Sequence, residues 1–122
     1  MGMANCQGKA NGGDERGSFM IIVTGQARFG QGEIERLKSA LKMNIQASRA
    51  EAGCARYDYS VDISDPDLLH ISEEWSDEEA IADHMASPHM AQLMTTLGDA
   101  RLESISVNAY EAHFLKPLLG SG

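Results

Sequence analysis

The chain has 122 residues and a mass of 13.2 kDa, a length typical of one domain with its own hydrophobic core. Its net charge of -8, with ten scattered Lys and Arg residues, argues against a phosphate-backbone binder, so we expect no nucleic-acid partner. No apolar run approaches the ~20 residues that span a bilayer, and we see no secretory signal. The expected location is therefore the cytoplasm, without a membrane partner.

Residues 1–18 are rich in glycine and polar residues and hold almost nothing apolar, which predicts a flexible N-terminal tail. We expect one domain over 19–116 and a short C-terminal tail over 117–122. Cys6 and Cys54 have neither C-x-x-C spacing nor a metal-finger partner, so a disulfide framework is not expected.

The segment 19–29, FMIIVTGQARF, is β-branched and apolar, which predicts a central strand, with Gly25 as a bulge or a point of close approach. Residues 30–53 then predict an amphipathic helix with Glu33 on its polar side and Gly53 as its stop. Its apolar face has three- and four-residue spacing and comprises Ile34, Leu37, Leu41, Ile45 and Ser48.

Residues 54–63 alternate with a period of two, which predicts a strand with Tyr57 and Tyr59 on one face. The SDPD sequence at 64–67 predicts a turn. Residues 68–75 alternate again, and the two strands are expected to form a hairpin. The shared face of the second strand comprises Leu69, Ile71, Glu73 and Trp75.

The SDEE sequence at 76–79 resembles a capping box in which Ser76 caps a helix that begins at about Asp77. The helix is expected to break at SPH and to restart with Ser87 as cap and Pro88 in the first position, ending at Gly98. Residues 102–115 predict a last strand.

The predicted order is strand, helix, strand, strand, broken helix, strand. This is the β-α-β-β-α-β pattern of the ferredoxin-like α+β fold, an antiparallel sheet with both helices on one face. We expect the uncovered face to carry a mixed row that includes apolar residues, and the same sheet of a second subunit to cover it. The sequence therefore predicts a homodimer.

Three motifs carry a resemblance to a known family. They are GC-x-x-Y at Gly53–Tyr57, E-x-W at Glu73–Trp75, and A-x-x-x-H-x-x-S-P-H at Ala80–His89. Together, over about 19–114, they resemble the antibiotic biosynthesis monooxygenases. The resemblance implies a dimeric α+β barrel with a pocket in each subunit, and members that oxidise quinol-type or aromatic polyketide substrates with dioxygen and no flavin, metal or haem.

Other members are haem-degrading enzymes or isomerases of small phosphorylated signals. The haem-degrading branch would require a histidine near Met94 and an asparagine near Gly25 and Gln26, and neither is present. The expected function is a cofactor-independent monooxygenase acting on a small aromatic substrate with dioxygen. The alternatives are a dimeric aromatic-ligand-binding or stress-response protein without catalysis, and an isomerase of a small signalling molecule.

Cofactor-free oxygenation needs a base that ionises the substrate and an apolar wall that excludes water. His84 shares the core-facing side of Ala80 and Ile81, so it is the first candidate base, or else a hydrogen-bonded core histidine. His89 is the second candidate, and it either borders the pocket mouth or faces solvent.

The remaining candidates would contact substrate. Trp75 is a core anchor or an N–H donor to a ligand, and Tyr57 is a phenolic donor or a packing residue. Glu73 is a structural partner of an arginine or of Tyr57, or else a pocket acid. Met85 and Met90 are adaptable core residues or pocket wall. No metal site and no cofactor are expected.

Overall fold

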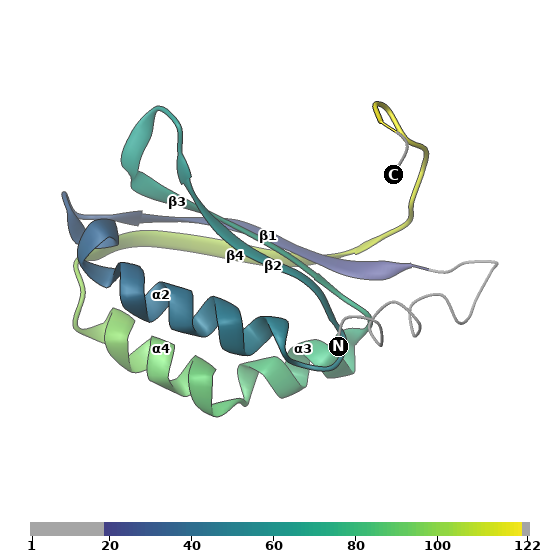
Figure 1. Ribbon diagram of the computed structural model, residues 1–122, viewed down its shortest axis with the longest axis horizontal. Coiled ribbons are helices and arrows are strands. Elements are labelled where there is room, and N and C mark those ends of the chain that lie inside the picture. The colour runs from purple at the N-terminus through teal and green to yellow at the C-terminus, as the bar shows by residue number, and fades with distance from the viewer. Residues whose placement is uncertain (1–18, 121–122) are drawn as a thin grey trace.

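The structure is a computed structural model that describes residues 19–120, so the tail predicted over 1–18 lies outside the described residues (Figure 1). The elements are, in chain order, strand β1 (Met20–Phe29), helix α2 (Glu33–Arg49), strands β2 (Cys54–Asp62) and β3 (Asp65–Trp75), helices α3 (Glu78–Met85) and α4 (Pro88–Gly98), and strand β4 (Leu102–Ala112). The predicted element order is confirmed.

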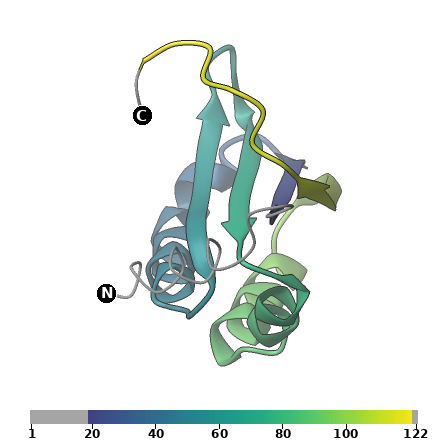
Figure 2. The same ribbon diagram turned by 90° about the vertical axis from the view of Figure 1, so that its right-hand side faces the viewer.

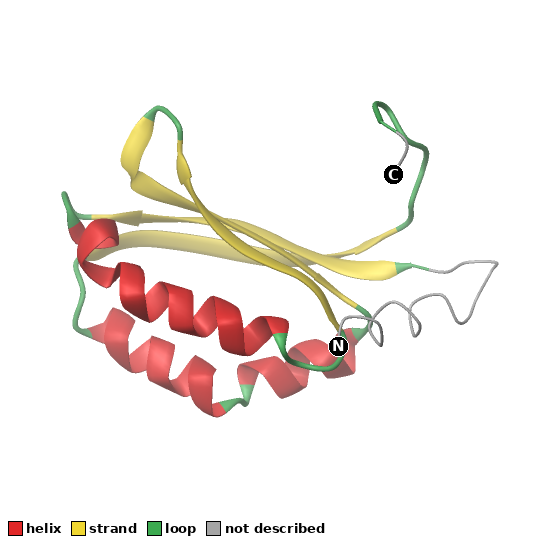
Figure 3. Ribbon diagram, viewed as in Figure 1, coloured by secondary structure: helices red, strands yellow, loops and turns green. Residues whose placement is uncertain are grey.

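The four strands form one sheet in the order β2-β3-β1-β4, with every neighbouring pair antiparallel. All three helices lie on one face of this sheet (Figures 1 and 3). This is the ferredoxin-like α+β fold that the sequence predicts. The hairpin between β2 and β3 is confirmed, although β3 begins at Asp65, inside the segment that we expected to be a turn.

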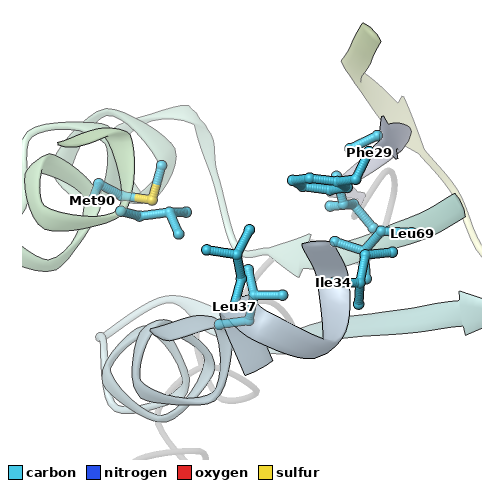
Figure 4. Close-up of a cluster of buried hydrophobic side chains, with 9 residues drawn as sticks. Phe29, Ile34, Leu37, Leu69 and Met90 are labelled. Carbon is cyan, nitrogen blue, oxygen red and sulfur yellow. The ribbon is translucent and has the colours of Figure 1, made fainter. Parts of the chain in front are cut away.

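The core lies between the sheet and the helices. Figure 4 shows Leu37 and Ile34 of α2, Phe29 and Leu69 of the sheet and Met90 of α4 gathered in one cluster. A second cluster surrounds Trp75, which is fully buried, and includes Tyr57 and Cys54. Both clusters contain alternate side chains of the strands, because every second residue of a strand faces the helices.

Gly25 marks a close approach of two strands. A Cβ atom at this position would lie 2.3 Å from the carbonyl oxygen of Ser106 and 2.7 Å from the Cα of Val107, both in the backbone of β4. The register irregularity of the β1–β4 pair falls between Arg28 and Phe29 instead. Of the two predicted roles of Gly25, the structure therefore supports close approach.

Helix α2 differs from its prediction at both ends. It ends at Arg49 with Ala50 as C-cap, and Gly53, with a φ of 88°, belongs to the turn that leads into β2. Glu33 is buried rather than on the polar side of the helix, and its carboxylate accepts hydrogen bonds from Arg36 and from the backbone N–H of Arg101. These bonds hold the pKa of Glu33 at about 2.

The second helical region breaks where the sequence predicts. Ser87 caps α4 by accepting from the N–H of Met90, and Pro88 occupies the first turn. The predicted capping box is wrong in one respect: the cap of α3 is Asp77, whose carboxylate accepts from the N–H of Ala80, and not Ser76. An Asp one residue later in the chain competes for the same role and has the extended backbone of a cap.

The face of the sheet opposite the helices is uncovered and mainly polar at its centre, with Thr24, Gln26 and His70 among its side chains. Residues 113–120 continue from β4 and rise on this side of the sheet (Figures 1 and 2). Apolar side chains of this segment are exposed, namely Phe114, Leu115, Leu118 and Leu119. Among the described residues, no helix is both long and apolar enough to cross a membrane.

Candidate active site

A cavity of about 350 Å³ lies between the sheet and helices α3 and α4, and its lining is predominantly apolar. This volume falls within the range of small-ligand sites. Five of the residues singled out from the sequence line it: Tyr57, Glu73, His84, Met85 and Met90. Trp75 and His89, the other two, do not line it.

His84 of α3 is the buried basic group at this cavity, with 2% of its surface exposed. Its ring centroid lies 4.7 Å from that of Trp75 and 5.2 Å from that of Tyr57. Its Nδ1 lies 2.7 Å from Oε2 of Glu51. The ring therefore contacts two aromatic side chains, and one of its two nitrogens is hydrogen-bonded to a carboxylate.

Glu51 was missed in the sequence. It lies in the turn between α2 and β2, where no periodicity marks a core-facing position. Its carboxylate is mostly buried and accepts from a second imidazole, since Nε2 of His89 lies 2.5 Å from the same Oε2 atom. His89 does not line the cavity, and its side chain is only 23% exposed to solvent. It bonds to the same carboxylate as His84.

The same three side chains have the donor types of a divalent cation site, two imidazoles and one carboxylate, with ligand atoms within 4.8 Å of one another. The sequence predicted no such cluster, because Glu51 is more than thirty residues from the histidines. In the structure the three groups satisfy one another as hydrogen-bond partners, at 2.7 and 2.5 Å.

A polar cluster of two tyrosines and an asparagine lies at the β2 side of the cavity. The hydroxyls of Tyr57 and Tyr59 are 2.8 Å apart, and Nδ2 of Asn44 donates to both, at 3.0 and 2.8 Å. Burial raises the pKa of both phenols, so both stay protonated at neutral pH.

Hydrogen counting shows what this cluster can donate. One hydroxyl hydrogen serves the bond between the two tyrosines, and the second is left for another acceptor, such as a ligand oxygen. Asn44 was also missed in the sequence. The available signal was a polar residue within the buried stripe of α2, three residues after Leu41 and four before Ser48.

Glu73 is buried at the cavity wall and accepts a hydrogen bond of 2.8 Å from the indole N–H of Trp75. Burial raises the pKa of Glu73, although the bond from Trp75 opposes the shift. The sequence analysis allowed an arginine or Tyr57 as the structural partner of Glu73, but within residues 19–120 neither is hydrogen-bonded to it. The partner is the tryptophan on the same strand face, two residues away.

Methionines complete the cavity wall on the helical side. Met90 is 7% exposed, whereas Met85 and Met94 are about half exposed or more, and all three line the cavity. Thioether side chains are flexible and polarisable, so they suit the wall of a site for flat aromatic molecules.

The comparisons with known proteins agree with this architecture. A family model described as antibiotic biosynthesis monooxygenase matches residues 20–96. A solved structure from Deinococcus radiodurans, provisionally assigned as an antibiotic biosynthesis monooxygenase, is 30% identical with a TM-score of 0.77, over 83% of this chain and 100% of that chain.

Two further solved structures are similar at lower identity. One, from Pseudomonas aeruginosa, is 25% identical with a TM-score of 0.72 and covers 80% of this chain and 97% of its own. Another, described as an antibiotic biosynthesis monooxygenase, is 26% identical with a TM-score of 0.71, over 77% of this chain and 99% of that chain. No curated protein matches the chain.

Proposed function

The chain belongs to the antibiotic biosynthesis monooxygenase family, and from this premise we propose that it oxidises a small aromatic phenol, quinol or polyketide-like substrate with dioxygen, without a cofactor. The observation that carries the proposal is a buried imidazole, His84, held at the wall of an apolar cavity. This combination suits a reaction that begins with removal of a proton from a substrate hydroxyl.

The proposed reaction balances without an external reductant. A phenol with a free ring C–H reacts with one O₂, so that one oxygen atom becomes a carbonyl of the quinone product and the other leaves as water. All four electrons come from the substrate. Ionisation of the hydroxyl is the first requirement, because a phenolate or enolate transfers electrons to dioxygen far more readily than the neutral form.

The residues around the cavity divide this task. His84 takes the hydroxyl proton, which a positioned base accelerates by about 10²- to 10⁴-fold in general. The apolar wall keeps water away from the anion and from reactive oxygen intermediates. The hydroxyl pair of Tyr57 and Tyr59 supplies the hydrogen-bond donor for a substrate oxygen that gains negative charge.

Dioxygen uptake tests the proposal directly. We expect the purified protein, treated with a chelator and free of flavin, to consume O₂ in the presence of at least one member of a panel of hydroquinones and naphthols. With labelled dioxygen, one labelled atom should appear in the product. The Glu79→Gln variant, altered at an exposed residue of α3, should show the same rate.

Three other outcomes would contradict the proposal. Tight binding of the panel compounds without oxygen uptake would indicate a binding protein. Product formation under anaerobic conditions would indicate an isomerase. Uptake that disappears with the chelator and returns with an added metal ion would indicate metal-dependent chemistry.

We also propose that two copies pair through the uncovered sheet face. The apolar side chains of residues 113–120 are 82–93% exposed in a single copy, and a second copy would bury them together with the sheet. Light scattering should give about twice the chain mass of 13.2 kDa. Truncation after Ala112 should weaken the pair, whereas truncation after Gly120 should not; a monomeric full-length chain would contradict the proposal.

A further inference from the structure

We propose that Glu51 is a positioning residue: it holds His84 in the tautomer with the proton on Nδ1, so that Nε2 is the acceptor at the cavity, and His89 fixes Glu51 in place. The inference rests on the proposed function in one respect, that His84 removes the substrate proton. It concerns a residue that no motif of the sequence points to.

The position of Glu51 is set by the end of helix α2. Its N–H donates to the carbonyl of Ser48 at 3.0 Å, and its carbonyl accepts from the N–H of Cys54 at 3.2 Å. The backbone of this turn is thus held at both sides, by the last turn of the helix and by the first residue of β2. A carboxylate on such a turn has a defined direction, which a positioning role requires.

The break between α3 and α4 lets two histidines reach one oxygen. On a continuous α-helix, residues five apart point about 140° away from each other around the axis. Ser87 and Pro88 end one helix and start the next, and His84 and His89 then converge on Oε2 of Glu51, with ring centroids 5.8 Å apart. Within residues 19–120, these two imidazoles are the side chains that bond to this carboxylate.

The hydrogen-bonding capacity of the Glu51 carboxylate determines the tautomer of His84. An ionised carboxylate only accepts hydrogen bonds, so the nitrogen that faces it must carry a proton. For His84 that nitrogen is Nδ1, which leaves a lone pair on Nε2 in the neutral ring. Contacts with Trp75 and Tyr57 oppose rotation of the ring that would exchange the two nitrogens.

His84, Glu51 and His89 lie at different distances from the cavity. His84 lines the cavity, whereas Glu51 and His89 do not. In the proposed step the substrate O–H bond breaks and an Nε2–H bond forms, and the resulting imidazolium remains paired with Glu51. The other ionisable groups facing the ring are Glu73 of β3 and Tyr57 of β2.

This pairing matters because His84 is almost completely buried, at 2% exposure. A cation formed in such a place is unfavourable unless an anion is already bonded to it. Glu51 provides that anion before the reaction starts, and it needs no rearrangement during the step. His89 adds a second N–H to the same oxygen and so restricts rotation of the carboxylate.

Nitrogen NMR of the histidine side chains tests the inference without any substrate. Long-range ¹H–¹⁵N spectra distinguish protonated from unprotonated ring nitrogens, and the His84 signals are assigned by their loss in His84→Gln. We expect wild-type His84 to show a protonated Nδ1 and an unprotonated Nε2 at neutral pH. In Glu51→Gln, whose amide can donate as well as accept, we expect a mixture of both tautomers.

The kinetic arm uses the best substrate of the hydroquinone and naphthol panel. Glu51→Gln should lower kcat about 10-fold or more, with a change in KM of less than about threefold, because the residue acts through His84 and does not touch substrate. Glu51→Asp, which keeps the charge, should recover part of the rate. Glu79→Gln is the matched control, an acid-to-amide change at an exposed position.

Three results would overturn the inference. They are a wild-type His84 protonated on Nε2, a Glu51→Gln protein with the wild-type tautomer, and one equivalent of a divalent ion that copurifies with the wild type and is lost in Glu51→Gln. If no panel compound is oxidised, the proposed function fails, and the NMR result still decides the role of Glu51. The wild-type spectrum alone is decisive if Glu51→Gln does not fold.

Discussion

Replacing His84 by alanine is expected to lower turnover of the best panel substrate by about 10²-fold or more, the usual effect of losing a general base. The reason is position: the imidazole is buried at the cavity wall, and within residues 19–120 no other histidine lines the cavity. Stopped-flow or oxygen-electrode rates at saturating substrate give the measurement.

Two controls separate chemistry from packing in this experiment. Added imidazole should restore part of the rate of His84→Ala, because the deleted side chain leaves a space of its own shape. Glu79→Gln, altered at an exposed residue of α3, should keep the wild-type rate. A His84→Ala protein that is folded and has an unchanged rate would remove His84 from the mechanism.

Replacing Trp75 by alanine should cause the largest loss of stability of any single change discussed, about 3–5 kcal/mol in the free energy of unfolding. Trp75 is completely buried at the end of β3, where its ring contacts Tyr57 and His84. Truncation also leaves the buried carboxylate of Glu73 without its N–H donor, which adds a desolvation cost. Against a typical domain stability of about 5–15 kcal/mol, this is a large share.

Urea unfolding followed by circular dichroism measures this effect, since the chain has a single tryptophan and the variant loses its fluorescence signal. Trp75→Phe should lose less, because it keeps most of the apolar volume. Met43→Ala, at a side chain that is 68% exposed, should stay within about 0.5 kcal/mol of wild type. A loss below about 1 kcal/mol for Trp75→Ala would show that Trp75 does not anchor the core.

Much of the fold could be predicted because its signals are local. Alternation identified the buried face of β3, the β-branched and apolar content of 19–29 identified β1 as a strand, and the Ser87–Pro88 pair located the helix break. The prediction was wrong where two neighbouring residues could both cap a helix, as Ser76 and Asp77 could for α3. It was also wrong where a charged side chain is buried with a partner that is distant in the sequence. Glu33 is the second case, since its partners include the backbone of Arg101, sixty-eight residues away.

Within the candidate site, the sequence alone determined which residues face the core: His84 from its helical spacing, and Tyr57 and Glu73 from strand alternation. It left open which nitrogen of His84 is held, what pairs with Glu73, and whether His89 faces the cavity.

Only the tertiary structure decided these points, because each depends on groups from elements that are far apart or newly oriented. Glu51 meets His84 and His89 only after α2 ends beside the break between α3 and α4. Periodicity reports which side of an element is buried, but the partner that a buried polar atom finds is set by how the elements pack.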